Sequence, residues 1–473
     1  MRYLIRNAKI VNEGTIRQGN VLVENGRIAD IAFTDGEEKN AMGSVWALSA
    51  TLLHSGSQII EAEGSYLLPG VIDTHVHFRD GGDGENPAGD MATESRAALM
   101  GGVTSVIDMP NTNPTTTTLE ALEQKEEAAA AKMAVNYGFM VGATNDNIDM
   151  LLGLSPDRYA AVKLFLGSST GNMLVNDEAE LERLFQESRK LIVAHCEEEA
   201  VVQANLRTFR AEFEGTEKET AALHPQIRNT EACYLSTYKA VERARRHGTR
   251  LHIAHISTAT ELDLLSNKAL DEKNITAEVT PNHLWFDDRD YDTLGNFIKC
   301  NPAIKSNNDR LALWAGLFDG LIDTIATDHA PHPLAAKQKP YFQAPSGIPS
   351  IQHSLLTMLE GVFHNTADDY DEVLNTWLPL IVEKMCHNPA SIFGIQDRGF
   401  IRKGDYADLV LVRPDEKGRE VTRKSLLYKC GWSPLEGATF HTEITHVLVN
   451  GKLAMADGEL LDTTAARKLQ FTK

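Results

Sequence analysis

Several features that are scarce or missing narrow what this 473-residue chain can be. It has only five cysteines, and none forms a Cys-x-x-Cys pair, which argues against a disulfide framework and favours reduced thiols in a cytosol. No apolar run reaches membrane-spanning length, and the first residues lack the apolar core of a signal peptide. We therefore expect a cytoplasmic protein with no membrane partner.

Positive charge is also scarce. The chain has 46 Lys and Arg residues against 66 Asp and Glu residues, and its formal net charge is −20. A surface of this sign repels phosphate backbones and anionic lipids, so nucleic acid is excluded as a natural partner. An anionic small molecule would have to be captured by a local cluster of positive charge. The hydrophobic content of 42% is that of an ordinary globular protein, and the length allows a large core.

Short strand patterns with tight turns occupy both ends of the chain. They appear at residues 3–11 and 28–31 near the N-terminus and at residues 408–412 and 446–449 near the C-terminus. Two β-rich ends around a long middle predict one small β-sandwich domain built from both termini. Residues 35–56 show no regular spacing of apolar residues, which predicts an excursion loop. The expected boundaries are residues 1–65 and 394–473 for the β-sandwich and 66–393 for the middle domain.

The middle of the chain alternates between strand-like and helix-like patterns. Apolar, β-branched runs are separated by amphipathic stretches of helical period, which is typical of parallel βα units. Eight such runs predict an α/β fold, a (β/α)₈ barrel. The strand-like runs are residues 67–77, 102–109, 137–142, 161–166, 191–195, 251–255, 275–279 and 322–326, and the clearest helical stretches are 118–132, 177–189, 230–246 and 260–270.

Two histidines stand at the end of the first barrel run, in Asp73-Thr74-His75-Val76-His77. Residues two apart on a strand point to the same side, so His75 and His77 would present two imidazoles to one place, which suits a transition-metal ion. Alone, such a pair is a weak signal, because most histidines of this kind are structural. Further ligands at neighbouring strand ends would make it strong.

Such ligands occur. Catalytic groups of a barrel sit at the C-terminal ends of its strands, and the later runs end at or near Lys163, His195, His255 and Asp328. For any one histidine a core or rim role is the better interpretation, but their joint placement makes coincidence a poor explanation. His252 lies deeper in its strand and is assigned a structural role, and His224 stays unassigned.

With these residues the chain resembles the amidohydrolase superfamily, whose dinuclear members use a His-x-His pair, a carboxylated lysine, two later histidines and a final aspartate. The resemblance covers essentially the whole chain, including the closing strand after Gly404. It implies two Zn²⁺ ions per subunit, bridged by a hydroxide and by carboxylated Lys163. Two alternatives for this lysine stay open: a rim lysine paired with a carboxylate, and an aspartate bridge. The implied metal ligands are His75, His77, Lys163, His195, His255 and Asp328.

The segment Ala326-Thr327-Asp328-His329-Ala330-Pro331-His332, followed by Lys337, resembles the second motif of the dihydroorotase family. Arg79, two positions after His77, and the turn Met109-Pro110-Asn111-Thr112 also fit that family. The resemblance implies that Arg79, Asn111 and His332 bind a substrate carboxylate, and that Asn301, Pro345 and Gly347 contact the pyrimidine ring. One departure is Asn282-His283, where the family often has two adjacent histidines, and His283 is not placed among the ligands.

The implied reaction is the reversible cyclisation of N-carbamoyl-L-aspartate to L-dihydroorotate in pyrimidine biosynthesis. Catalytic Asp328 would accept a proton and return it to the leaving nitrogen. Two other interpretations stay open. One is another cyclic-amide hydrolase, a dihydropyrimidinase (hydantoinase) or allantoinase. The other is a non-catalytic scaffold of the same fold, which is disfavoured because such proteins typically lose metal ligands and this chain keeps all six. The sequence also leaves a homo-oligomer open.

Overall fold

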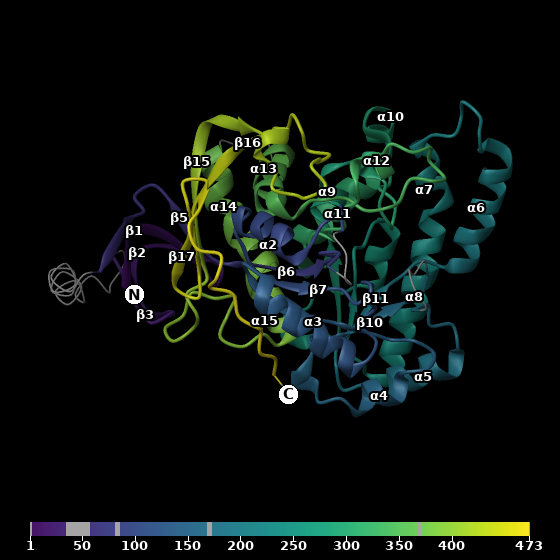
Figure 1. The fold of residues 1–473 in the computed structure, drawn as a ribbon, viewed down its shortest axis with the longest axis horizontal. Coiled ribbons are helices and arrows are strands. Elements are labelled where there is room, and N and C mark those ends of the chain that lie inside the picture. The colour runs from purple at the N-terminus through teal and green to yellow at the C-terminus, as the bar shows by residue number, and fades with distance from the viewer. Residues whose placement is uncertain (1, 35–56, 81–85, 168–172, 367–369, 473) are drawn as a thin grey trace.

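The computed structural model describes residues 2–34, 57–80, 86–167, 173–366 and 370–472. The predicted excursion loop at 35–56 lies outside these residues. A barrel of parallel strands makes up one part of the molecule, and strands from both termini make up the other (Figure 1). This confirms the predicted (β/α)₈ barrel and the β-rich domain built from the two ends of the chain. Among the described residues, no helix is both long and apolar enough to cross a membrane.

The barrel strands are parallel, and their hydrogen bonds follow the chain order. One sheet has the order β6-β7-β8 and the other β14-β13-β12-β11-β10-β9. The predicted run 137–142 is divided into β8 and β9, which pair with different neighbours. The barrel closes where the His77 N–H donates to the His329 carbonyl at 2.8 Å. The bounds are β6 Val71–Val76, β7 Val103–Asp108, β8 Asn136–Phe139, β9 Val141–Gly142, β10 Val162–Phe165, β11 Ile192–His195, β12 Leu251–Ile253, β13 Ile275–Val279 and β14 Thr324–Ile325.

Helices connect these strands and lie around the outside of the barrel (Figure 1). Several begin with a side-chain cap, such as Thr118 before α3 and Asn229 before α8, which satisfies free backbone N–H groups. The helices are α2 Met91–Met100, α3 Leu119–Lys132, α4 Ile148–Gly153, α5 Glu178–Glu187, α6 Glu199–Phe213, α7 His224–Ile227, α8 Thr230–His247, α9 Pro281–Trp285, α10 Tyr291–Leu294, α11 Asn307–Phe318, α12 Leu334–Lys337, α13 Ser354–Thr366, α14 Tyr370–Val382 and α15 Asn388–Phe393.

One predicted helix is wrong. The stretch 260–270 forms only a 3₁₀ helix, Thr260–Leu264, and the chain is extended at Leu265. The reason is local competition: the Ser266 hydroxyl accepts a hydrogen bond from the Lys268 N–H at 3.4 Å, which offers the backbone an alternative to the helix.

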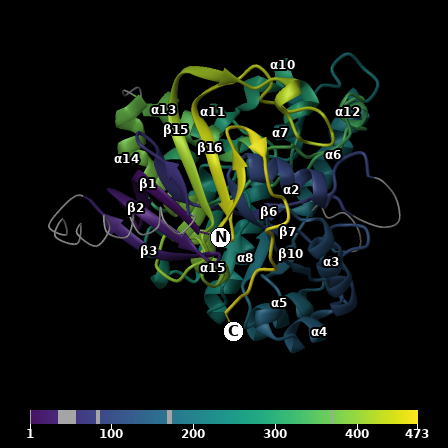
Figure 2. The same cartoon turned by 60° about the vertical axis from the view of Figure 1, so that its left-hand side comes forward.

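The terminal strands form one nine-stranded sheet in which purple N-terminal and yellow C-terminal strands lie side by side (Figure 2). The predicted run 67–77 is two strands, β5 in this sheet and β6 in the barrel, joined at Gly70. A Cβ there would lie 2.0 Å from Thr104 Oγ1, so only glycine permits this close approach. Helices α13 and α14 pack against the same sheet. The sheet consists of β1 Arg2–Asn12, β2 Thr15–Glu24, β3 Arg27–Phe33, β4 Gln58–Glu61, β5 Tyr66–Pro69, β15 Leu409–Glu420, β16 Thr439–Val449, β17 Lys452–Ala456 and β18 Glu459–Leu460.

Candidate active site

One cavity of about 300 Å³ opens at the C-terminal ends of the barrel strands. The structure brings every predicted site residue to its wall, although these residues come from strand ends and loops spread over most of the chain. Their individual roles stay predictions, but their convergence is a fact of the fold. The predicted residues that line the cavity are His75, His77, Arg79, Asn111, Lys163, His195, His255, Asn301, Asp328, His332, Pro345 and Gly347.

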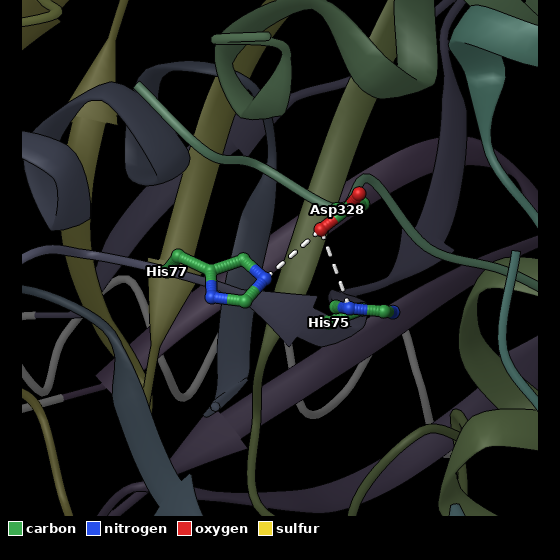
Figure 3. A group of neighbouring side chains, drawn as sticks. All are labelled: His75, His77 and Asp328. Atoms are coloured by element: carbon green, nitrogen blue, oxygen red, sulfur yellow. Dashed lines mark hydrogen bonds and ion pairs between the residues drawn. The ribbon is translucent and has the colours of Figure 1, made fainter. Parts of the chain in front are cut away.

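His75, His77 and Asp328 form the tightest group in the cavity. The two imidazoles point at one carboxylate oxygen (Figure 3): Asp328 Oδ1 lies 2.9 Å from His77 Nε2 and 3.3 Å from His75 Nε2. Their candidate ligand atoms all lie within 4.8 Å of one another. Burial opposes ionisation of Asp328, but the two histidines keep the pKa of this carboxyl below its ordinary value. The group therefore offers two nitrogens and an anionic oxygen to a metal ion.

His195 and His255 form a second group of ring nitrogens. His195 Nδ1 and His255 Nε2 lie 2.9 Å apart, and both side chains are buried. Burial lowers the pKa of each imidazole, and the neutral form that results is the one that binds metal. The other nitrogen of His195 faces Glu197 Oε2 at 3.0 Å, and Glu197 is also paired with Arg228. The sequence analysis missed Glu197, whose only signal is an acidic residue two positions after a strand-end histidine.

Lys163 is buried in the cavity wall, where the described residues provide it with no hydrogen-bond partner. Its side chain is 1% exposed, and no acceptor in the described part of the structure bonds to its Nζ. Burial lowers the pKa of this lysine to about 8. The alternative of a rim lysine paired with a carboxylate is therefore not what the described residues show.

Arg79 is partly buried, and among the described residues its enclosed Nε has no hydrogen-bond partner and no carboxylate forms an ion pair with its guanidinium. Its closest polar contact joins Nη2 to His332 Nε2 at 3.4 Å, but that nitrogen is also 2.9 Å from the Ser346 carbonyl. A nitrogen that donates its proton to the carbonyl cannot also accept from the guanidinium. Burial lowers the pKa of Arg79. A cation held partly out of water without an anion beside it is costly, so this site is suited to an anionic ligand.

Three of the site residues have a left-handed backbone. The φ angles are 62° at Arg79, 36° at His255 and 49° at Asp328. Residues other than glycine rarely adopt this region, and where they do the surrounding structure holds them there. All three side chains line the cavity.

Glu278 on β13 connects two candidate ligands, and the sequence analysis did not identify it. Its Oε1 accepts from His75 Nδ1 at 2.7 Å and from the backbone N–H of His255 at 3.2 Å. Burial opposes ionisation, but His75 and His252 hold the pKa of Glu278 far below its ordinary value. The available signal was a single acidic residue inside an otherwise apolar strand.

Three further histidines that the sequence singles out but that are not predicted ligands have other partners. His252 bonds to Thr276 Oγ1 at 2.8 Å inside the barrel, in keeping with its expected structural role. His283 is bonded through both ring nitrogens, to Thr280 and to the Pro302 carbonyl. His224 faces the Cys300 carbonyl at 2.7 Å and the Tyr341 hydroxyl at 2.8 Å, so it supports the loop that carries Asn301.

The fold and the site define a class of enzyme. The model of the amidohydrolase family matches residues 66–454, and the chain belongs to this family. The expected resemblance is thereby confirmed. The chain is a cyclic amidohydrolase, and the cavity that the predicted site residues line lies at the C-terminal end of its barrel.

The relatives include enzymes with different substrates. The chain is 34% identical to a dihydroorotase from Halobacterium salinarum, covering 88% of this chain and 91% of the relative. It is 27% identical to an allantoinase from Salmonella paratyphi B, covering 95% and 94%. Among solved structures, the L-hydantoinase (dihydropyrimidinase) from Arthrobacter aurescens aligns with a TM-score of 0.87 at 25% identity, over 99% of both chains. The class is therefore clear from these comparisons, and the substrate has to be argued from the cavity.

Proposed function

We propose that the protein is a cytoplasmic dihydroorotase that interconverts N-carbamoyl-L-aspartate and L-dihydroorotate in pyrimidine biosynthesis. The observation that carries this proposal is the partly buried Arg79 guanidinium, which faces the cavity without a carboxylate partner among the described residues. Dihydroorotate has a ring carboxylate that a guanidinium can bind through two parallel hydrogen bonds. Dihydrouracil, hydantoin and allantoin have no such group. The dihydroorotase among the relatives agrees with this choice.

The donor set fits a zinc centre. His75, His77 and Asp328 would hold one ion, and His195 and His255 the other, because neutral imidazoles and a carboxylate are ordinary zinc ligands. Zn²⁺ bound there would act as a Lewis acid that polarises a carbonyl and lowers the pKa of a bound water. Lys163 would join the two groups after its neutral amine adds to CO₂ and loses a proton. This converts a buried lysine without a partner into an anion.

Proton transfer and substrate binding would depend on residues of the chain itself. In the hydrolytic direction water adds to the ring carbonyl, the ring C–N bond breaks, and one proton must reach the leaving nitrogen. Asp328 is ionised at neutral pH and can accept that proton and return it, first as base and then as acid. Arg79, Asn111 and His332 would hold the carboxylate, while Asn301 and the backbone of Pro345 and Gly347 would hold the ring.

A direct test compares substrates on zinc-loaded protein of measured metal content. We expect kcat/KM for L-dihydroorotate to exceed that for dihydrouracil, hydantoin and allantoin by about a hundredfold or more, because a site built for a polar group rejects analogues that lack it. Comparable hydrolysis of any of the other three compounds would refute the dihydroorotase assignment and favour another cyclic-amide hydrolase. Absence of turnover with all four, at two zinc ions per chain, would instead indicate a non-catalytic member of the family.

A further inference from the structure

Lys337 belongs to the motif after β14, but neither the metal centre nor the carboxylate site uses it. It is the last residue of α12 and is 1% exposed. Its Nζ donates to three backbone carbonyls, those of Gly347 at 2.9 Å, Pro345 at 3.0 Å and Lys299 at 3.1 Å. Two of these carbonyls belong to the residues expected to contact the pyrimidine ring, and the third lies two positions before Asn301.

This arrangement suits a charged lysine. Three acceptors need three N–H groups, which an ammonium has and a neutral amine does not. In the described residues no carboxylate is paired with Lys337, so its charge is balanced by the carbonyl dipoles and by the Trp432 ring, whose centroid lies 5.7 Å from Nζ. Burial lowers the pKa of Lys337 to about 7, which shows how unfavourable this position is for a cation. A buried ammonium with these partners is a specific way to fix loops in space.

A second buried lysine holds the same two loops. Lys299 Nζ donates to the carbonyls of Ala344 at 2.6 Å and Tyr341 at 2.8 Å, and the Lys299 carbonyl accepts from the Gly347 N–H at 2.8 Å. Gly347 itself has φ 144°, and a Cβ there would lie 2.4 Å from the Ala330 carbonyl. The loop of residues 344–347 is thus fixed from two sides against the loop that carries Asn301.

We propose that Lys337 is a positioning residue. It holds the backbone of Pro345 and Gly347 in the place where this backbone can pair with the amide groups of the substrate ring. This inference rests on the proposed function, because it assumes that a ring amide compound occupies the cavity. The site would then recognise two parts of the substrate through different residues. Arg79 selects the carboxylate, whereas Lys337 acts on the ring and should matter equally for ring compounds that have no carboxylate.

The experiment measures two constants on zinc-loaded protein, the KM for L-dihydroorotate and the Ki of dihydrouracil as a competitive ligand. Lys337→Met keeps much of the side-chain length but removes the charge and all three donors. We expect both constants to rise about tenfold, kcat to change by less than about threefold, and zinc content to stay at the wild-type value. In Arg79→Met only the constant for dihydroorotate should rise.

Lys190→Met is the matched control. Lys190 is also a buried lysine whose Nζ bonds to a backbone carbonyl, that of Pro156, but it lies just before β11, at the opposite end of the barrel strand that ends at His195. The Lys190→Met variant should therefore have the same KM, Ki and zinc content as the wild-type protein.

The outcomes are distinguishable. If wild-type protein does not turn over dihydroorotate, the proposed function fails. If it does and Lys337→Met leaves both constants within twofold of wild type, the positioning role is refuted while the function stands. If Lys337→Met does not fold, Lys299→Met takes its place in the test. This variant removes the two bonds from Lys299 Nζ to the carbonyls of Tyr341 and Ala344, and the same criteria apply.

Discussion

Arg79→Met should convert a site selective for dihydroorotate into one that barely distinguishes it from dihydrouracil. The side chain is partly buried at the cavity wall, and its Nη2 lies 3.4 Å from His332 Nε2, with no ion-pair partner among the described residues. Charge-assisted hydrogen bonds to a carboxylate, two in a bidentate pair, contribute about 2–4 kcal/mol in such a setting. Converted at about 1.4 kcal/mol per factor of ten, the loss of kcat/KM for dihydroorotate is about 30- to 700-fold.

The same substitution should not weaken the ligand-free protein. A partly buried guanidinium without an anion beside it opposes folding, so Arg79→Met should unfold at an equal or higher temperature than wild type. Arg398→Met provides the contrast, because Arg398 is buried but is paired with Asp408. Removing Arg398 leaves that carboxylate unpaired and should cost about 3–5 kcal/mol of unfolding free energy, with substrate preference unchanged in the protein that folds.

The assay is steady-state kinetics with both ring compounds, combined with thermal unfolding of zinc-loaded protein. If Arg79→Met lowers kcat/KM for dihydroorotate by less than about fivefold, or lowers it for dihydrouracil to the same extent, Arg79 does not bind the substrate carboxylate.

The remaining predictions concern the metal centre. His255→Ala should reduce zinc stoichiometry and abolish turnover, and full zinc content with normal activity would remove His255 from the ligand set. Lys163→Ala should lose at least one ion, with partial rescue by short carboxylic acids, whereas an unmodified lysine in a zinc-loaded high-resolution map would rule out the carbamate. Asp328→Asn should keep most of the metal and lose most of the turnover, so near-normal turnover with an unchanged pH profile would exclude a proton-carrying role. Glu278→Ala should weaken zinc affinity by about 10- to 100-fold in a chelator competition, because the partner that orients His75 is gone. Glu261→Gln, a change at another buried carboxylate that contacts no candidate ligand, should have no such effect.

Much of the architecture could be read from local patterns. Alternating strand and helix periods predicted the barrel, and the β-rich ends predicted the terminal domain. Both predictions were possible because each pattern depends only on residues that are consecutive in the sequence. The candidate ligands could be found for the same reason: in a barrel they stand at strand ends, and a strand end is visible in a sequence. Local competition also explains the failure at 260–270, where a serine hydroxyl bonds the backbone and the helical pattern is not realised.

The sequence by itself therefore determined the fold class and placed twelve residues around one site, all of which line the cavity. Only the tertiary structure decided how they are held. The Glu278 carboxylate bonds to His75 from 203 residues away, and Lys337 bonds to three carbonyls that no pattern links to it. The left-handed backbone of Arg79, His255 and Asp328 is likewise held by the surrounding structure, although histidine and aspartate adopt it more readily than most residues. Such contacts depend on barrel closure, which brings distant strand ends together, and closure is a property of the whole chain.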